Sequence, residues 1–537
     1  MNGTARREID ASGALVTPGF VDLHTHYDGQ ATWDDHLEPS SCHGVTTVVQ
    51  GNCGVGFAPV HPGDHDRLIE LMEGVEDIPG TALHEGLQFN WVSFPEYLDV
   101  LDARSRDVDL GTQVPHAAVR LFVMGERGVN REPATDDDIA SMAAVTRQGI
   151  DAGALGFSTS RTVNHRSIKG ELTPTLNAEA KELLGIVDAL RAAGAGVIQA
   201  ISDFREVDDE FAMLREVAAA SGRPMSISVA QSQQRPAVAA RLLELIAEAN
   251  ADGITMRAQV AARAIGLLFG FEATLHPFMT SPGWTAVKDL PPAERVARLR
   301  QPEVRAALIA GMRTPLERRM LVRIETLSDF ARMFPLGNPP VYEPAASTSI
   351  AAIAEREHRD PADVAYDLLL ADDGRGLLYM PGGNYANGNL DIVKEQLEHP
   401  FSVSGLSDGG AHVGTICDAS FPTTLLQWWG RDRPSGRLPI ELLVAKQTRM
   451  TAETVGLLDR GVIATGYRAD LNIIDFETLG LDAPQIRHDL PAAGRRLFQT
   501  AHGYLHTFVA GTETRTHGTA TGATPGHLVR GPKQRPS

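Results

Sequence analysis

Cysteine is scarce in this chain, whose 537 residues include only Cys42, Cys53 and Cys417. Three scattered cysteines cannot build the disulfide framework on which small secreted domains rely. The first residues, MNGTARREIDASG, also lack the apolar core of a secretory signal. We therefore expect a cytoplasmic protein.

Long hydrophobic runs and an excess of positive charge are also absent. No stretch of the sequence approaches the roughly 18 uninterrupted apolar residues that a membrane-spanning helix needs. Lys and Arg number 49 against 68 Asp and Glu, which gives a formal net charge of −19. Binding to nucleic acid or anionic membrane requires clustered basic side chains that displace counterions. We expect neither partner, and instead a small-molecule substrate.

Apolar runs alternate with helical patterns along most of the chain. The runs include GVTTVVQ, ALGFSTS, AGVIQAIS, PMSISVAQ, GITMRAQV and PFSVSGLSDGG. This order is typical of βα units and predicts an α/β protein with a parallel sheet and helices outside it. Several runs are apolar without alternation, which indicates burial on both faces in a barrel or a doubly wound sheet.

Three parts of the chain depart from this pattern. Residues 289–355 contain helical segments followed by a proline-rich loop, which indicates an insertion over one face. After about residue 461, short alternating strands with glycine punctuation predict a small β domain. The last residues, 520–537, are rich in Gly, Pro and basic residues and predict an extended tail.

The stretch GFVDLHTHYDGQ places His24 and His26 at the end of a predicted buried strand, residues 15–23. Residues i and i+2 of a strand point to the same side, so both imidazoles can reach one ion. The alternative is two polar residues at the point where a strand enters a loop.

Five motifs in order resemble the amidohydrolase superfamily, in its N-acyl-D-amino-acid deacylase branch. They are PGFVDLHTH, GVTTVVQGNCGVGFAP, AGALGFSTSRT, SGLSDGGAH and GYRADLNIID. The resemblance implies a distorted (β/α)8 TIM barrel with metal at the C-terminal ends of its strands. It also implies a small β-sandwich built from both chain termini. The implied boundaries are 1–16 for the first sandwich part, 17–440 for the barrel, and 441–519 for the last helix with the remaining sandwich.

The same resemblance implies a metal centre formed by His24, His26, Cys53 and Asp408. Imidazole and thiolate suit zinc, and we expect one divalent ion per chain. The resemblance further gives Asp408 the role of general base and acid, which takes a proton from water and passes it to the leaving amine. Cys53 has an alternative as a small buried residue and Asp408 as a helix cap.

Two expected ligands are missing, because the deacylase branch carries a histidine after each of the fifth and sixth strands. The corresponding stretches here, IQAISDF and ISVAQSQQ, contain none. Gln199, Ser202, Asp203 and Gln231 stand in their neighbourhood, and amides and hydroxyls are weak zinc ligands. Either the four remaining groups hold a single ion with an open position for water, or the centre is too poor to keep a metal.

Polar residues in the predicted barrel loops are candidates for substrate binding. Arg161 can pair with a substrate carboxylate, and its alternative is a salt bridge on a loop. His412 is a candidate second proton carrier or replacement ligand. The other candidates are Ser160, His165 and Gln231.

These features predict a metal-dependent hydrolase of a linear amide, an N-acyl amino acid. Hydrolysis of a cyclic amide or ester is the alternative within enzymes, since the same chemistry serves several carbonyl substrates. A catalytically degenerate barrel that binds a small ligand is the alternative from another class. The chain also begins late in the first sandwich element of the resembling family. An incomplete sheet edge there would favour a homo-oligomer.

Overall fold

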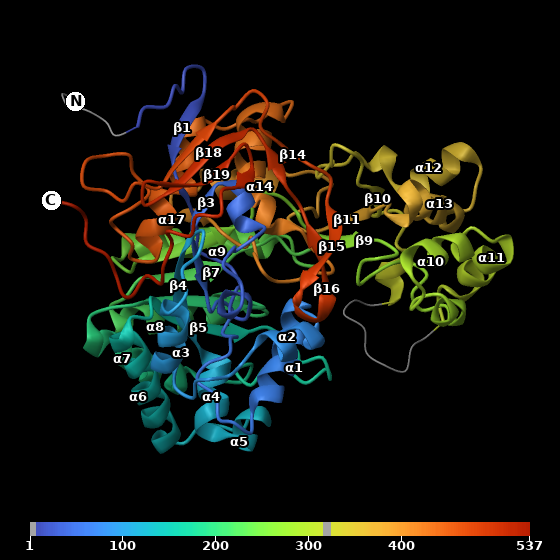
Figure 1. Cartoon of the computed structure of the whole chain (residues 1–537). Coiled ribbons are helices and arrows are strands. Elements are labelled where there is room, and N and C mark those ends of the chain that lie inside the picture. The colour runs from blue at the N-terminus through green and yellow to red at the C-terminus, as the bar shows by residue number, and fades with distance from the viewer. Residues whose placement is uncertain (1–6, 315–323) are drawn as a thin grey trace.

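The computed structural model describes residues 7–314 and 324–537, and a sheet of eight parallel strands lies at its centre (Figure 1). The strands are β2 (Phe20–Asp22), β3 (Val45–Gln50), β4 (Asp109–Pro115), β5 (Gly156–Arg161), β6 (Val197–Ser202), β7 (Met225–Ser228), β8 (Met256–Val260) and β12 (Ser402–Ser404). Each strand pairs with the strand before it, and a parallel bridge between Thr25 and Gly409 joins the two ends of the sheet. The predicted α/β barrel is confirmed.

Helices cover the outside of the barrel, as parallel strands require. They are α1 (His65–Glu76), α2 (Gly80–Gly86), α3 (Phe94–Asp102), α4 (His116–Met124), α5 (Glu126–Val129), α6 (Asp136–Ala152), α7 (Ala180–Ala193), α8 (Val207–Ser221), α9 (Ala237–Ala251), α14 (Asp391–Glu398), α15 (Phe421–Thr424), α16 (Ile440–Lys446) and α17 (Arg449–Thr454). Local sequence fixes their ends. At α6, Thr135 and Asp138 form a reciprocal capping box, and Gly153 ends the helix with a left-handed backbone.

A separate body projects from the barrel between β8 and α14 (Figure 1). Its sheet contains β9 (Ile265–Phe269), β10 (Phe334–Pro335) and β11 (Leu378–Gly383), and its helices are α10 (Pro292–Leu299), α11 (Pro302–Gly311), α12 (Ile350–Glu357) and α13 (Pro361–Gly374). Its side chains form their own apolar cluster, which includes Phe271, Phe278 and Tyr366. The body is wider than the predicted insertion, 289–355, because the antiparallel pair of β9 and β11 carries it.

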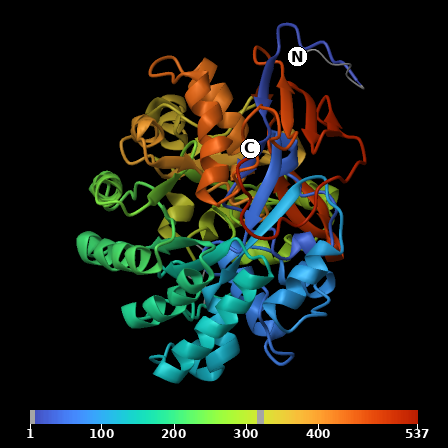
Figure 2. The same ribbon diagram turned by 90° about the vertical axis from the view of Figure 1, so that its left-hand side faces the viewer.

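Strands from both ends of the chain form a second sheet. β1 (Leu15–Pro18) pairs antiparallel with β13 (Leu471–Ile474), followed by β18 (Tyr504–Val509), β19 (Thr512–Thr516) and β20 (Thr519–Ala520). Figure 2 shows the N-terminal strand beside the C-terminal ones. Two further antiparallel pairs complete this β-rich part: β14 (Gly480–Leu481) with β17 (Ala501–His502), and β15 (Gln485–Leu490) with β16 (Gly494–Phe498).

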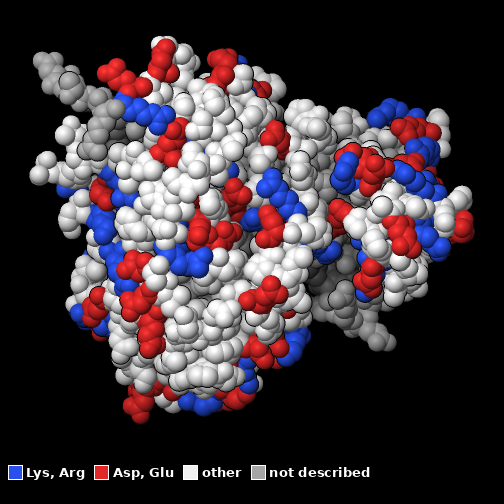
Figure 3. All heavy atoms as spheres, viewed as in Figure 1, with Lys and Arg blue, Asp and Glu red and all other residues white. Residues whose placement is uncertain are grey.

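The face of the molecule in Figure 3 shows acidic and basic side chains intermixed, with no broad field of either sign. None of the described helices is both long enough and apolar enough to cross a membrane.

One buried carboxylate joins the N-terminal end of the barrel strands to the C-terminal segments of the chain. Asp109, the first residue of β4, is fully buried and lies 2.7 Å from Arg460 Nη1 and 2.8 Å from Arg468 Nε. Its other oxygen accepts the backbone N–H of His527 in the extended tail. The tail then pairs with the barrel at Leu110 through Leu528. The Asp109 charge, removed from water at this point, is stabilised by these two cationic partners and by this amide.

We predict that Asp109→Asn lowers the free energy of unfolding by about 3–5 kcal/mol, because it removes the buried carboxylate that Arg460 and Arg468 share and leaves Arg460 with the partly exposed Asp459. Urea unfolding followed by circular dichroism measures the change. Asp151→Asn is the matched control, since Asp151 pairs with Arg147 at the surface, where a pair contributes about 1 kcal/mol or less. Equal unfolding midpoints for the two variants would contradict the prediction.

Candidate metal centre and adjoining cavity

His24 and His26 follow β2 at the C-terminal end of the barrel, and both are almost completely buried. Their Nε2 atoms point to one carboxylate oxygen: Oδ1 of Asp408 lies 3.4 Å from His24 and 3.8 Å from His26. The rings are 5.5 Å apart between centroids. The two imidazoles therefore share one side of the strand end and face the same point.

Cys53 joins this pair from the turn after β3. Its Sγ lies 3.3 Å from His24 Nε2, and one ligand atom each from His24, His26 and Cys53 lies within 4.8 Å of the others. The backbone at Cys53 has φ of 55°, in the left-handed region that side chains rarely adopt, and Gly54 follows with φ of 67°. Such strain is typical of positions where a side chain must be aimed at a functional site.

Asp408 comes to the cluster through the closure of the barrel. Its amide donates to the His24 carbonyl at 3.2 Å, and the His26 amide donates to the Gly409 carbonyl at 2.8 Å. Its backbone is also left-handed, with φ of 49°. The Asp408 side chain is 17% exposed, against 1% for each histidine. Of these three side chains, the Asp408 carboxylate is therefore the most accessible to solvent.

The proton positions at His24 suit an ion on its Nε2 side. The amide oxygen of Gln259 lies 2.5 Å from His24 Nδ1, and the Gln259 amide nitrogen donates to Ser226 Oγ at 2.8 Å. Because a carbonyl oxygen only accepts, Nδ1 carries the proton and Nε2 keeps its lone pair. That lone pair faces Cys53 and Asp408.

The remaining donors also fit a cation. Among the described residues, His26 Nδ1 is a buried nitrogen without a hydrogen bond, although a carboxylate oxygen of Glu76 lies 3.3 Å from it. Burial lowers the pKa of His26 well below its usual range, and His24 and His412 add to this effect. Burial raises the pKa of the Cys53 thiol. A neutral imidazole is a ready ligand, and a cation would offset the cost of a buried thiolate. His24, His26 and Cys53 thus form a donor set that fits a zinc-type ion.

The residues that replace the two missing histidines have other partners. Gln199 on β6 accepts the Cys53 N–H with its amide oxygen at 2.8 Å, so it holds the ligand turn in place. Asp203 receives hydrogen bonds from Thr162 Oγ1 and the Val163 amide.

Gln231 and Ser202 bond elsewhere. The Gln231 amide oxygen accepts the N–H of Ala386, and its backbone N–H bonds to Asn384 in the loop after β11. Ser202 donates to Glu210 on α8. The predicted substrate residue Gln231 therefore ties the projecting body to the barrel.

The structure divides the remaining substrate candidates. Ser160 Oγ lies 2.8 Å from His165 Nδ1, and burial lowers the pKa of His165 to about 3, with His412 and His24 adding to this effect. His412 Nε2 lies 4.0 Å from Asp408 Oδ2. Arg161, by contrast, donates to the Ala178 carbonyl on the helix side of β5. Three of these four candidates are thus grouped beside the metal cluster, and Arg161 is directed away from it.

Glu76 is a residue of the site that the sequence analysis missed. The last residue of α1, it is 1% exposed, with Oε1 3.3 Å from His26 Nδ1 and Oε2 3.5 Å from His412 Nε2. Its backbone carbonyl accepts the His412 N–H. Burial raises its pKa well above the usual range, and Asp408 adds to this. The available signal was a carboxylate on the apolar face of α1, at helical spacing from Leu68 and Met72.

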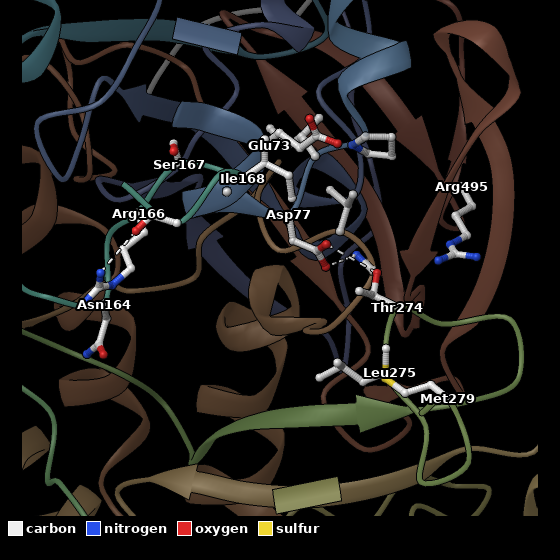
Figure 4. Close-up of a pocket in the computed structure, with 16 residues that line it drawn as sticks. Glu73, Asp77, Asn164, Arg166, Ser167, Ile168, Thr274, Leu275, Met279 and Arg495 are labelled. Atoms are coloured by element: carbon white, nitrogen blue, oxygen red, sulfur yellow. Dashed lines mark hydrogen bonds between the residues drawn. The ribbon is translucent and has the colours of Figure 1, made fainter. Parts of the chain in front are cut away.

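Figure 4 shows the wall of a cavity of about 400 Å³, which none of the cluster's own residues lines. Three of its wall residues, Asp77, Val413 and Asn164, are chain neighbours of Glu76, His412 and His165. Other walls come from the loop after β9 and from Arg495 on β16. The cavity therefore brings the barrel, the projecting body and the β-rich part together at one side of the metal cluster.

We predict that Glu76→Gln weakens zinc binding by about 10- to 100-fold, because carboxylates behind metal-ligating histidines orient the ring and raise its basicity. Competition with a chromogenic chelator measures the affinity. Glu73→Gln, one helical turn earlier on α1, is the matched control and should bind zinc like the unaltered chain. Identical affinities in both variants would show that Glu76 does not position His26.

Comparison with known proteins extends these observations. Residues 7–514 match the model of the amidohydrolase family. D-aminoacylase of Alcaligenes xylosoxydans xylosoxydans is 25% identical over 481 residues, which cover 89% of this chain and 81% of that protein. N-acyl-D-aspartate deacylase of the same organism is 26% identical over 475 residues, which cover 87% and 77%.

Two solved structures share the fold. A crystal structure of D-aminoacylase superposes with a TM-score of 0.63 at 22% identity, covering 98% of this chain and 91% of that one. N-acyl-D-glutamate deacylase from Bordetella bronchiseptica, in complex with zinc and a phosphonate inhibitor, gives a TM-score of 0.61 at 22% identity, covering 97% and 90%.

Proposed function

The chain belongs to the amidohydrolase family, in its D-aminoacylase-like branch, and from this premise we propose that it removes the acyl group from N-acyl amino acids. The family places it among metal-dependent hydrolases of carbon–nitrogen bonds other than peptide bonds. The observation that carries the finer proposal is that both imidazoles face one oxygen of Asp408 while Cys53 Sγ lies 3.3 Å from His24 Nε2.

We further propose one zinc ion per chain, held by His24, His26 and Cys53, with Asp408 facing it. Support comes from the donor set and from the amides that stand where the resembling branch has further histidines. One study of D-aminoacylase describes a binuclear centre with activation by one metal and attenuation by the second. When bound, such an ion supplies Lewis acidity, which polarises a carbonyl and makes water more acidic.

The side chains around this position have distinct tasks in the proposed reaction. Asp408 Oδ1 accepts a proton from the attacking water and later delivers it to the leaving amine nitrogen. His412, from the same loop, is placed to donate a hydrogen bond to the oxyanion that forms on the carbonyl. Gln259 and Glu76 keep the two histidine rings in the required orientation. Burial of the cluster excludes bulk water from it.

We predict that Asp408→Asn lowers kcat for N-acyl amino acid hydrolysis by about 10²- to 10⁴-fold, the range of general acid–base catalysis. Zinc content should change little, because three other ligands remain. Release of free amino acid from N-acyl amino acids is the assay, and ring opening of cyclic imides and lactones is measured in parallel. Asp372→Asn, at an exposed ion pair with Arg375, is the control. Undiminished hydrolysis by the Asp408 variant would remove this residue from the mechanism.

We also predict about one zinc per purified chain by mass spectrometry, and loss of most of it in Cys53→Ser. A hydroxyl is a far weaker zinc ligand than a thiolate. Cys417→Ser is the matched control, because Cys417 is equally buried but lies outside the ligand group that His24, His26 and Cys53 form. Equal zinc content in the two variants would mean that Cys53 is a packing residue.

A further inference from the structure

Residues 526–533, which we call the C-terminal strap, cross the N-terminal end of the barrel beside β4 and α17 (Figure 1). The strap pairs with the barrel through isolated bridges rather than through a strand of its own. Its backbone hydrogen bonds to the barrel measure 2.7–3.2 Å. The partners are Arg106 and Leu110 at β4, Gly153 before β5, and Gly456 and Leu458 after α17. The strap thus spans this end of the barrel from β4 to α17.

Basic side chains of this segment meet acidic side chains of the barrel helices. Arg530 Nη2 lies 2.7 Å from Asp99, and its Nε lies 3.1 Å from Asp102, both on α3. Arg535, two residues past the strap, pairs with Glu453 on α17 at 2.9 Å. The chain as a whole has a net charge of −19, so a basic segment is attracted to the rest of the molecule.

Gly526 allows the strap to approach the barrel closely. A Cβ atom added to Gly526 would collide with the Val108 carbonyl and with the backbone nitrogen of Asp109. These are backbone atoms, which cannot move aside as the end of a flexible side chain can. The substitution Gly526→Ala therefore blocks this fit while it changes no residue of the barrel.

Val529 of the strap reaches the inside of the barrel. It is 1% exposed and belongs to an apolar cluster that is separate from the main core. The barrel strands contribute Val21 of β2, Val49 of β3 and Val403 of β12 to this cluster. Val48, the neighbour of Val49, lies instead in the main core with side chains of the outer helices. Successive residues of a strand face opposite sides, so the cluster with Val529 lies on the inner face of the barrel.

The three strands in this cluster are the strands that lead to the proposed metal centre. His24 and His26 follow β2, Cys53 follows β3, and Asp408 follows β12. Val529 therefore packs between the lower parts of strands whose upper ends must stay together for these side chains to face one point.

We propose that the C-terminal strap docks on the barrel as a separable unit and that its docked state raises the affinity of the centre for zinc. The second half of this inference rests on the proposed function. The first half rests on the contacts alone. Thr521 and Gly522, which precede the strap, are exposed. The ladders between β2, β3, β4 and β12 and their neighbours do not include the strap, so its release leaves them paired.

Hydrogen exchange of the full, unaltered, zinc-free chain, read by mass spectrometry, tests the separable docking. The amides of Val529, Gly531 and Lys533 donate to barrel carbonyls, so they exchange when the strap leaves. We expect them to exchange together, about 10-fold or more faster than the amides of β6 to β8, because a local opening costs less than global unfolding. Strap amides that exchange only at the rate of the barrel strands would overturn the docking proposal.

Gly526→Ala tests the coupling to the metal centre. Strap exchange should rise about 10- to 100-fold with an unchanged circular dichroism spectrum, and zinc affinity, measured by chelator competition, should fall about 5- to 20-fold. Gly63→Ala is the matched control, because Gly63 is exposed and a Cβ there meets nothing within 4 Å. Val529→Thr, which keeps the shape but buries a hydroxyl, is the second variant if Gly526→Ala fails to fold. Unchanged zinc affinity in a variant whose strap is released would overturn the coupling.

The reverse effect in the unaltered chain separates this inference from the proposed function. Coupling between two binding events is reciprocal, so zinc must slow the exchange of the strap amides by the same factor by which strap docking raises zinc affinity. If zinc binds but leaves strap exchange unchanged, the coupling is wrong and the metal centre stands. If the unaltered chain binds no zinc, the metal centre and the coupling both fall, and exchange of the zinc-free chain alone decides the docking.

Discussion

The site depends on the closure of the barrel between its first and last strands. Two backbone hydrogen bonds, from Asp408 to the His24 carbonyl and from His26 to the Gly409 carbonyl, join segments that lie at opposite ends of the catalytic sheet. They hold the carboxylate against the two imidazoles. A barrel that opened between its first and last strands would separate the proposed base from the proposed ligands. The same two backbone hydrogen bonds therefore close the barrel and assemble the site.

Two glutamine side chains orient the proposed metal ligands. Gln259 fixes the tautomer of His24, and Gln199 holds the turn that carries Cys53. Both are buried, and each forms hydrogen bonds that an apolar residue would leave unmade. Because an amide is a weak zinc ligand, these positions support the ligands without adding to them. The result is a small donor set with a well-defined orientation.

Segments outside the barrel shape the space next to that centre. Glu76 and Asp77 come from the end of α1, Leu275 and Met279 from the start of the projecting body, and Arg495 from a hairpin of the β-rich part. The chemistry belongs to the barrel strands and their loops, whereas the shape and charge of the cavity come from these additions. Such a division lets the cavity change while the cluster stays the same.

The sequence by itself indicated a parallel α/β sheet, the strand ends that carry His24, His26 and Cys53, and the place of Asp408 after the last strand, and its family resemblance added the barrel. Burial on both faces of parallel strands and the two-residue period of a strand leave a direct signal in the order of residues. The place of Glu76 beside His26 and His412 was decided only by the tertiary structure. Glu76 is a charged residue in an ordinary helix, and its role depends on what packs against it. The same reason explains Arg161, whose position one residue after Ser160 turns it to the helix side of β5.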